Sequence, residues 1–412
     1  MRILWLSAWC PLPADNGIKL RTSHLLRALA QKHTVDLLTF APDVPEATNR
    51  QQLADLCEAV ELIPETPFAN HVAGRILGWF TPRPRSMVAN HSTAMAEAVQ
   101  RRAEQPYDLV IASDLHMAPY ALMLPNVPRM IEEIKLALLR DQFIQQKHLP
   151  SRLRTGLTWL KTSRYIAALL SHFAGVTVPS QRELALVNAL APRYTHLAVI
   201  PNGVDVQGYS GYFTTPDNHK LVYPGAISYH ANFDAVSYFS HAILPHLRQK
   251  HPDVELVVTG KATPEQIAAL PSTEGIHFTG YVDDIRPVVA GAWAEVVPIR
   301  EGDGTRLKVL EALALGTPVV TTTKGIEGLE LQPEQEVLVA DTAEDFVSQT
   351  MRLLTSTTLR QQLADRGRIA ARRYDWQHST QHFVHMVEGI VNDAYGIELR
   401  ARLTPRLPRQ LL

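Results

Sequence analysis

The sequence predicts an α/β protein with two consecutive domains, each built on a doubly wound parallel sheet. Short, continuous apolar runs alternate with helical stretches, which is typical of parallel strands covered on both faces. A turn-rich segment over residues 200–205 separates two series of such runs. The length of 412 residues suits two domains of roughly 150–200 residues each.

Each series of apolar runs supplies the strands of one sheet. We expect strands over 3–7, 34–39, 109–112, 175–178 and 197–200, with a helix over 22–31. In the second series we expect strands over 221–223, 255–259, 276–279, 295–298, 318–321 and 337–339, with helices over 234–249 and 305–315. These elements predict an N-terminal domain over 1–205, a C-terminal domain over 206–375, and a C-terminal helix and tail over 376–412 that return to the N-terminal domain.

Composition excludes several classes of protein. Hydrophobic residues make up 46% and charged residues 20%, so general disorder is excluded. A net charge of -1 gives no bulk argument for nucleic acid. Cys10 and Cys57 lack metal-ligand spacing, which fits a reducing compartment. Since no window reaches the roughly 18 uninterrupted apolar residues of a membrane span, we expect a cytoplasmic protein, with peripheral contact at the inner face of the membrane left open.

A glycine-containing loop between a strand and a helix carries the chemical signal, over residues 298–312. Thr305 is the expected N-cap of the helix. A helix N-terminus offers free N–H groups and partial positive charge to a phosphate, and Gly302 and Gly304 let the backbone approach a ligand closely.

Charged residues follow this loop. Arg306 and Lys308 lie in the expected first helical turn, where cations oppose the helix dipole, so an anion bound there would explain them. Glu311 lies one turn beyond Lys308 and is placed to accept hydrogen bonds from ribose hydroxyls. The alternative is an ordinary capped helix with solvated charges.

At these residues the chain resembles the retaining GT-B glycosyltransferases of family 4, whose fold is two Rossmann-like doubly wound domains facing a central cleft. Their signature is two glutamates with seven residues between them. Asp303 and Glu311 have that spacing, with Asp in place of the first Glu. The resemblance implies that Asp303 contacts the donor sugar and that Glu311 holds the ribose. The Gly-Thr-Arg-Leu-Lys run over 304–308 is similar to a subgroup associated with exopolysaccharide synthesis.

The resemblance extends along most of the chain. Residues 199–205 are similar to the family's inter-domain linker, and residues 278–284, with Gly280 and Tyr281, to the loop bordering the nucleotide base. Many members carry an Arg and a Lys after the first strand of the second domain. This chain has neither between Gly225 and Asn232, two residues that the resemblance places at the donor.

Arg306 and Lys308 are therefore expected to stabilise the leaving diphosphate themselves. No Asp-x-Asp occurs in the sequence, and His241, His246 and His251 do not share a helical face. We expect no metal and no cofactor beyond the nucleotide-diphosphate sugar, which is a co-substrate.

In the N-terminal half, the resemblance places the loop over residues 11–21 at the reaction centre, with Gly17 and Arg21 on the acceptor side. The chain also resembles the family at His116, which follows a strand end. The resemblance implies that this histidine lies near the donor sugar. The alternatives are a plain connecting loop and a structural histidine. Glu132 and Glu133 follow an apolar pair, and neither is predicted to be a catalytic base.

Residues 152–170 mix basic and apolar side chains. They suit either a basic amphipathic helix on an anionic membrane or an ordinary domain helix with a solvated basic face, and the sequence favours the ordinary helix.

The resemblance implies a metal-independent, retaining hexosyltransferase with His116, Asp303, Arg306 and Lys308 as catalytic residues. The expected partners are a nucleotide-sugar donor and a glycan or lipid-linked acceptor, in cell-surface polysaccharide assembly, with no nucleic acid. The alternatives are a nucleotide-sugar 2-epimerase-like enzyme and a non-catalytic nucleotide-sugar-binding protein.

Overall fold

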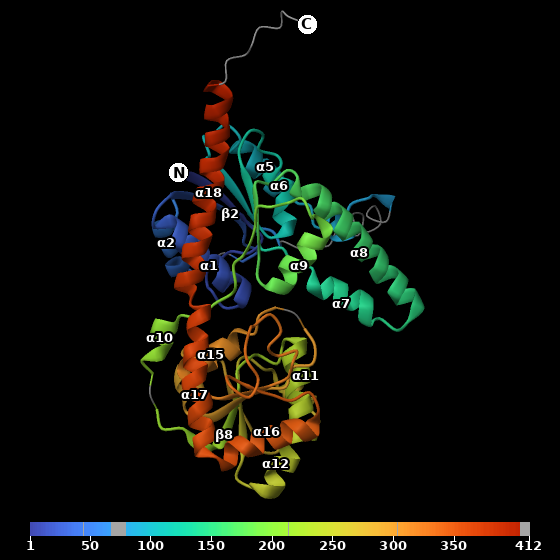
Figure 1. The fold of residues 1–412 in the computed structure, drawn as a ribbon, viewed down its shortest axis with the longest axis vertical. Coiled ribbons are helices and arrows are strands. Elements are labelled where there is room, and N and C mark those ends of the chain that lie inside the picture. The colour runs from blue at the N-terminus through green and yellow to red at the C-terminus, as the bar shows by residue number, and fades with distance from the viewer. Residues whose placement is uncertain (44, 67–79, 213, 303, 404–412) are drawn as a thin grey trace, which may run out of the picture. The chain divides into compact units, whose positions relative to one another are not determined.

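The structure, a computed structural model, describes residues 1–43, 45–66, 80–212, 214–302 and 304–403, with side chains up to residue 394 in the last helix (Figure 1). The chain forms two compact units. The first is Met1–Pro201 with Thr380–Leu412, and the second is Asn202–Ser379. The predicted boundaries were after residues 205 and 375.

The N-terminal sheet has seven parallel strands in the order β3-β2-β1-β4-β5-β6-β7. The strands are β1 Arg2–Ser7, β2 Thr34–Phe40, β3 Ala59–Ile63, β4 Leu109–Ser113, β5 Arg129–Glu132, β6 Gly175–Val178 and β7 Leu197–Val199. In register, Trp5 pairs with Leu37 on one side and Ile111 on the other. β3 and β5 were not among the strands predicted from the sequence.

Helices cover both faces of this sheet. They are α1 Gly17–Ala30, α2 Ala47–Leu56, α4 Arg85–Ala89, α5 Thr93–Arg101, α6 Ala118–Ala121, α7 Ala137–Gln145, α8 Leu149–Leu170, α9 Gln181–Leu190 and α18 Trp376–Leu403, with the 3₁₀ turn η1 Leu115–Met117. One core packs Ile3 and Trp5 against α1 and α18, and the other packs Leu4 and Leu6 against α5 and the end of α8. Among the described helices, none is both long and apolar enough to cross a bilayer.

Helix α18 rests on β6 because Gly175 leaves it room. A Cβ at Gly175 would lie 2.2 Å from Cδ1 of Ile390. Phe383, Val387 and Ile390 are buried in the same core as Trp5. The end of the chain is thereby part of the N-terminal unit.

The C-terminal sheet has six parallel strands in the order β10-β9-β8-β11-β12-β13. They are β8 Asp217–Tyr223, β9 Glu255–Thr259, β10 Ile276–Gly280, β11 Ala292–Val297, β12 Val319–Thr321 and β13 Leu338–Val339. The helices are α10 Val206–Ser210, α11 His230–Tyr238, α12 Leu244–Lys250, α13 Pro264–Ala268, α14 Arg286–Ala290, α15 Leu307–Leu315, α16 Ala343–Thr355 and α17 Thr357–Ala371, with the π-turn η2 Phe239–Ile243 and the 3₁₀ turn η3 Arg372–Tyr374.

Three predicted helix boundaries were wrong for local reasons. The Asn16 side chain accepts hydrogen bonds from the N–H groups of Ile18 and Lys19, so α1 begins at Gly17 rather than at residue 22. The helix expected over 234–249 is interrupted by η2, since Pro245 in the first turn of α12 has no N–H to donate. Helix α15 begins at Leu307 after Arg306, so Thr305 is not the N-cap.

Candidate active site

The candidate donor site lies where the C-terminal sheet reverses its winding. Strands β8 and β11 are neighbours in the sheet, and the chain continues from them in opposite directions. Ligands of doubly wound sheets bind at such a switch point, beyond the carboxyl ends of the strands. Gly225 follows β8, the glycine loop follows β11, and both therefore lie at this edge.

Lys308, in the first turn of α15, is held among polar and aromatic groups. Its Nζ lies 3.2 Å from Oδ1 of Asn232 and 3.7 Å from the centre of the Tyr223 ring. The same Asn232 oxygen accepts a hydrogen bond of 2.7 Å from the Tyr223 hydroxyl. Burial lowers the pKa of Lys308 to about 7, with nearby Arg306 acting in the same direction. The cation is thus fixed in place and ready to be stabilised by an anion.

Gly225 makes this arrangement possible. Its φ of +143° is a backbone conformation that side chains disfavour. A Cβ there would lie 2.9 Å from both the Lys308 Nζ and the Asn232 Nδ2. The structure therefore brings together three residues predicted for the donor site: Gly225, Asn232 and Lys308.

The glycine loop carries the second predicted cation. Arg306 is buried at 8% exposure, and its Nη2 would lie 3.2 Å from a Cβ at Gly302. Gly302 and Gly304 have φ values of +95° and +88°, so both use glycine's conformational freedom. Asp303, the predicted contact to the donor sugar, lies outside the described residues.

Glu311 lies on α15 one turn after Lys308. The Tyr209 hydroxyl donates a 3.3 Å hydrogen bond to its Oε1. Burial raises the pKa of Glu311, opposed by this hydrogen bond and by Lys308. Tyr209, on α10, was not predicted from the sequence.

A second missed residue is Glu295, in the middle of β11. It is fully buried, and in the described part of the chain neither of its carboxyl oxygens has a hydrogen-bond partner. Burial raises its pKa well above the usual value, with Lys308 opposing and Glu311 reinforcing that shift. A buried acid that interacts electrostatically with both Lys308 and Glu311 thus lies in the strand that leads to the glycine loop. The signal in the sequence was a lone acid inside an apolar strand.

Gly280 and Tyr281 lie farther along the sheet. Gly280 ends β10, the edge strand, which β9 separates from β8. Tyr281 is 65% exposed, and Nζ of Lys261 lies 5.8 Å from its ring centre. An open aromatic ring beside a cation is compatible with a base-contacting role, which stays a prediction.

The N-terminal sheet has its own switch point between β1 and β4, and His116 lies there. His116 Nδ1 is 2.8 Å from Oδ1 of Asp114, which also accepts from the His116 backbone N–H at 2.7 Å. Asp114 has φ 99° and ψ 149°, a conformation that is costly for a residue with a side chain. The loop that fixes His116 is therefore strained, as functional sites often are.

Arg21 and Gly17, predicted for the acceptor-side loop, belong to α1 instead. Arg21 is 1% exposed, and its Nε lies 2.6 Å from Oε1 of Glu132. Its Nη1 donates to the carbonyl of Ile200 at 2.7 Å. The guanidinium thereby ties α1 to β5 and to the chain after β7. A direct acceptor contact by Arg21 stays a prediction, and this burial argues against it.

Two acids at the end of β5 differ in their surroundings. Glu132 is buried on Arg21, whereas Glu133 has φ +66° and pairs with Nζ of Lys135 at 2.8 Å. Ser113, at the end of β4, donates to Glu132 at 3.2 Å. A polar cluster thus occupies the carboxyl ends of β4 and β5, and one of its members, Ser113, is close to His116 in the sequence.

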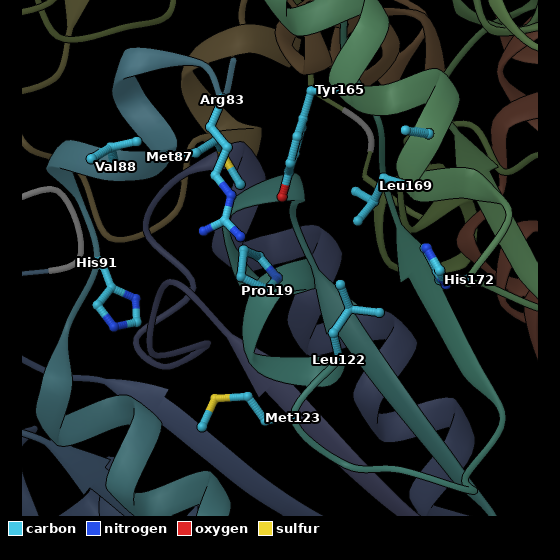
Figure 2. A pocket seen from close by; sticks show the side chains of 11 residues that line it. Arg83, Met87, Val88, His91, Pro119, Leu122, Met123, Tyr165, Leu169 and His172 are labelled. Carbon is cyan, nitrogen blue, oxygen red and sulfur yellow. The ribbon is translucent and has the colours of Figure 1, made fainter. Parts of the chain in front are cut away.

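An apolar pocket of about 710 Å³ lies in the N-terminal unit, formed by the segment around α4, by α6 and by α8. Figure 2 shows Arg83 and Tyr165 reaching from separate elements toward Pro119, while His91 and Met123 lie at other sides of the space. Apolar side chains make up most of the wall, among them Met87, Val88, Leu122 and Leu169. No predicted site residue lines it.

No group of three His, Cys, Asp or Glu side chains that would hold a metal ion occurs in the described parts of the chain.

Two doubly wound domains, each with polar side chains at the switch point of its sheet, have the architecture of enzymes that bind ligands at this edge. Residues 16–203 match the family described as Glycosyl transferase 4-like domain, and residues 218–356 match Glycosyl transferases group 1. The chain belongs to the GT-B glycosyltransferases that combine these two domains.

Relatives and solved structures agree with this assignment. The phosphatidyl-myo-inositol mannosyltransferase of Mycobacterium tuberculosis is 26% identical over 58% of this chain and 68% of its own length. The corresponding enzyme of Propionibacterium freudenreichii is 32% identical over 33% of this chain and 35% of its own length.

Solved structures share the fold at low identity. Anabaena HepE in complex with UDP and glucose superposes with a TM-score of 0.62 at 17% identity, covering 94% of this chain and 100% of that one. Sucrose-phosphate synthase from Thermosynechococcus elongatus has a TM-score of 0.65 at 17% identity, covering 95% and 99%.

Proposed function

We propose that this glycosyltransferase moves a hexose from a nucleoside-diphosphate sugar to a lipid-linked or glycan acceptor, with retention of anomeric configuration and without a metal. The single observation that carries the proposal is the position of Lys308. It is a cation held by Asn232 and Tyr223 at the start of α15, with Glu311 one turn further on.

The diphosphate is proposed to bind at the start of α15. The N–H groups of this helix, Lys308 and Arg306 would share the charge that develops as the sugar–phosphate bond loosens. A cation whose pKa is lowered by burial gains strongly from an incoming anion, since the pair relieves part of the desolvation cost. These two cations support the metal-independent form of the proposal.

The nucleoside is proposed to be held through its ribose by Glu311. Tyr209 fixes one oxygen of that carboxyl group, which leaves the other to accept from a ribose hydroxyl. His116, oriented by Asp114, is proposed to lie near the donor sugar. The configuration at the anomeric carbon is then retained because the acceptor hydroxyl attacks from the face that the phosphate leaves, and the leaving phosphate takes the proton of that hydroxyl. Asp303 keeps its proposed contact to the sugar.

A lipid-linked acceptor is supported by two observations. The curated relatives are named for mannosyl transfer to phosphatidyl-myo-inositol, a lipid. The apolar pocket of about 710 Å³, with Arg83 beside it, suits an apolar chain whose head carries negative charge. A role in cell-surface polysaccharide assembly, on the cytoplasmic side, completes the proposal. It is supported by the Gly-Thr-Arg-Leu-Lys run over 304–308.

The test is a transfer assay in two stages. A thermal-shift screen over UDP-, GDP- and other nucleotide sugars selects the donor, because a bound ligand raises the apparent stability. The donor is then incubated with lipid-linked and free glycan acceptors, and products are read by mass and anomeric NMR. We expect a glycosylated acceptor with retained configuration. Glu311→Ala and Lys308→Ala should lose at least about tenfold in transfer while staying folded. Normal turnover in both variants would overturn the assigned roles.

The same assay separates the alternatives. An epimerase would change its donor with no acceptor present, which mass-neutral donor conversion in NMR would reveal. A non-catalytic binding protein would bind the donor and turn over none of a wide acceptor panel.

A further inference from the structure

The first half of α8 packs on α7 but leaves a row of apolar side chains exposed. Every residue from 149 to 161 is half-buried or exposed, and the buried positions of the helix begin only at Thr162. Leu149 and Leu153 are 68% and 67% exposed, and Leu157 and Leu160 are 39% and 44% exposed. The sequence favoured an ordinary domain helix with a solvated basic face, and in this half of the helix four leucines are exposed as well.

The four leucines form one stripe. Their spacing of four, four and three residues places them on a single helical face. The neighbouring helix α7 adds Ile144, at 53% exposure. We call Ile144, Leu149, Leu153, Leu157 and Leu160 the leucine stripe.

Close packing of α7 against α8 supports the leucine stripe. A Cβ at Gly156 would lie 2.8 Å from the Phe143 ring, so the two helices approach closely at this glycine. Figure 1 shows α7 and α8 reaching out from the N-terminal sheet as a hairpin. A shallow groove of about 420 Å³ runs between Phe143 and the leucines. The exposed apolar surface is thus a defined face on an ordered element.

The charge around the stripe has one sign. Residues 146–170 contain five basic side chains and no acid: Lys147, Arg152, Arg154, Lys161 and Arg164. On α7, Asp141 is engaged by Arg182 at 2.5 Å. A second copy of this chain would bring the same positive charge to the same face, whereas anionic lipid headgroups complement it.

We propose that the α7–α8 hairpin docks the N-terminal domain on an anionic membrane surface. The leucine stripe enters the boundary between headgroups and acyl chains, while the arginines and Lys147 contact lipid phosphates. This surface shares no residue with the donor site, so the inference stands or falls independently of the proposed reaction.

Flotation with lipid vesicles tests the proposal on the full chain. The probes are phosphatidylcholine vesicles with and without about 30% phosphatidylglycerol. We expect the chain to float with the anionic vesicles and to lose most of this binding in pure phosphatidylcholine or in high salt. The Leu149→Ser/Leu153→Ser variant should bind at least about tenfold more weakly, while its nucleotide-induced thermal shift stays unchanged. The matched control is Ile369→Ser, which removes a side chain of 62% exposure from α17 and should keep full binding.

Equal flotation of the wild type and the double variant would overturn the proposal. Failure of the wild-type chain to float with anionic vesicles would overturn it too. If sedimentation without vesicles shows a dimer that the double variant dissociates, the stripe covers a second copy, and membrane docking is refuted.

Discussion

The side-chain oxygen of Asn232 lies 3.2 Å from the Nζ of Lys308 and ties the loop after β8 to the first turn of α15. This contact joins the two segments that flank the switch point of the C-terminal sheet. The Tyr223 ring, 3.7 Å from the same Nζ, closes the other side. The cation is therefore preorganised, and a diphosphate that binds here does not have to order it.

Lys308→Met should abolish this preorganised charge and keep the shape. We expect the affinity for a nucleoside diphosphate to fall about 10- to 100-fold, since hydrogen bonds to charged groups contribute about 1.5–3 kcal/mol. Affinity for the nucleoside alone should hardly change. Isothermal titration of both ligands measures the difference. Lys220→Met, which removes an exposed lysine paired with Asp217, is the control.

The Lys308→Met variant should be as stable as the wild type or more stable. Folding lowers the pKa of Lys308 from 10.5 to about 7, so the cost of burying its ammonium is fully present below pH 7 and is lost as the pH rises to 10.5. Burial raises the pKa of Glu295, which limits the negative charge that methionine would leave without a cation. We expect the free energy of unfolding at pH 6 to be equal or up to about 2 kcal/mol higher than in the wild type. A marked loss in urea titrations would contradict the assigned burial.

Glu295→Gln should move the pH dependence of donor binding. The Glu295 carboxylate, where ionised, favours the ammonium form of Lys308, and glutamine cannot. Diphosphate affinity should already fall as the pH rises through about 7 in the wild type, and the fall should begin at a lower pH in the variant. Binding curves between pH 5.5 and 8.5 measure the midpoint. An unmoved midpoint with only a uniform loss of stability would mean that Glu295 is purely structural.

Gly225→Ala should displace Lys308. The new Cβ would lie 2.9 Å from both Lys308 Nζ and Asn232 Nδ2, in a backbone conformation with φ +143°. We expect donor affinity to drop at least about tenfold, together with a destabilisation of about 1–3 kcal/mol from backbone strain. Gly275→Ala controls for the strain, because Gly275 has φ +70° and its added Cβ would meet only the flexible Arg248 side chain. If both variants bind donor alike, the contact with Lys308 is unimportant.

Arg21→Met should destabilise the N-terminal domain. It leaves Glu132 buried without its 2.6 Å partner, and breaking a buried pair costs about 3–5 kcal/mol. Urea-induced unfolding of the variant and of the wild type measures this loss of stability. A stable Arg21→Met chain with weakened acceptor binding alone would favour the acceptor-side role that the sequence suggested.

The parallel sheets could be predicted because their strands are continuous apolar runs, which need no knowledge of tertiary contacts. β6 was predicted at its observed bounds, Gly175–Val178. β3 was missed because Ala59–Ile63 includes Glu61 and is only partly buried. The start of α1 was missed because Gly17 indicates a loop by itself, and only the Asn16 cap makes it helical.

The site could be predicted only where its parts are close in sequence. Lys308 and Glu311 lie on one helix, so helical spacing brought them together. Tyr209 lies 102 residues from Glu311, and Arg21 lies 111 residues from Glu132, so no local pattern links either pair. Glu295 was interpreted as an ordinary residue of a predicted strand. Its effect on the pKa of Lys308 follows only from its full burial, which the sequence does not show.

The central claim is that the start of α15 binds the donor diphosphate. A structure of the chain with its bound nucleoside diphosphate tests it most directly. We predict phosphate oxygens within hydrogen-bond distance of Lys308 Nζ and the first N–H groups of α15, with the ribose on Glu311. A nucleotide bound elsewhere, with Lys308 still on Asn232 and untouched, would contradict it.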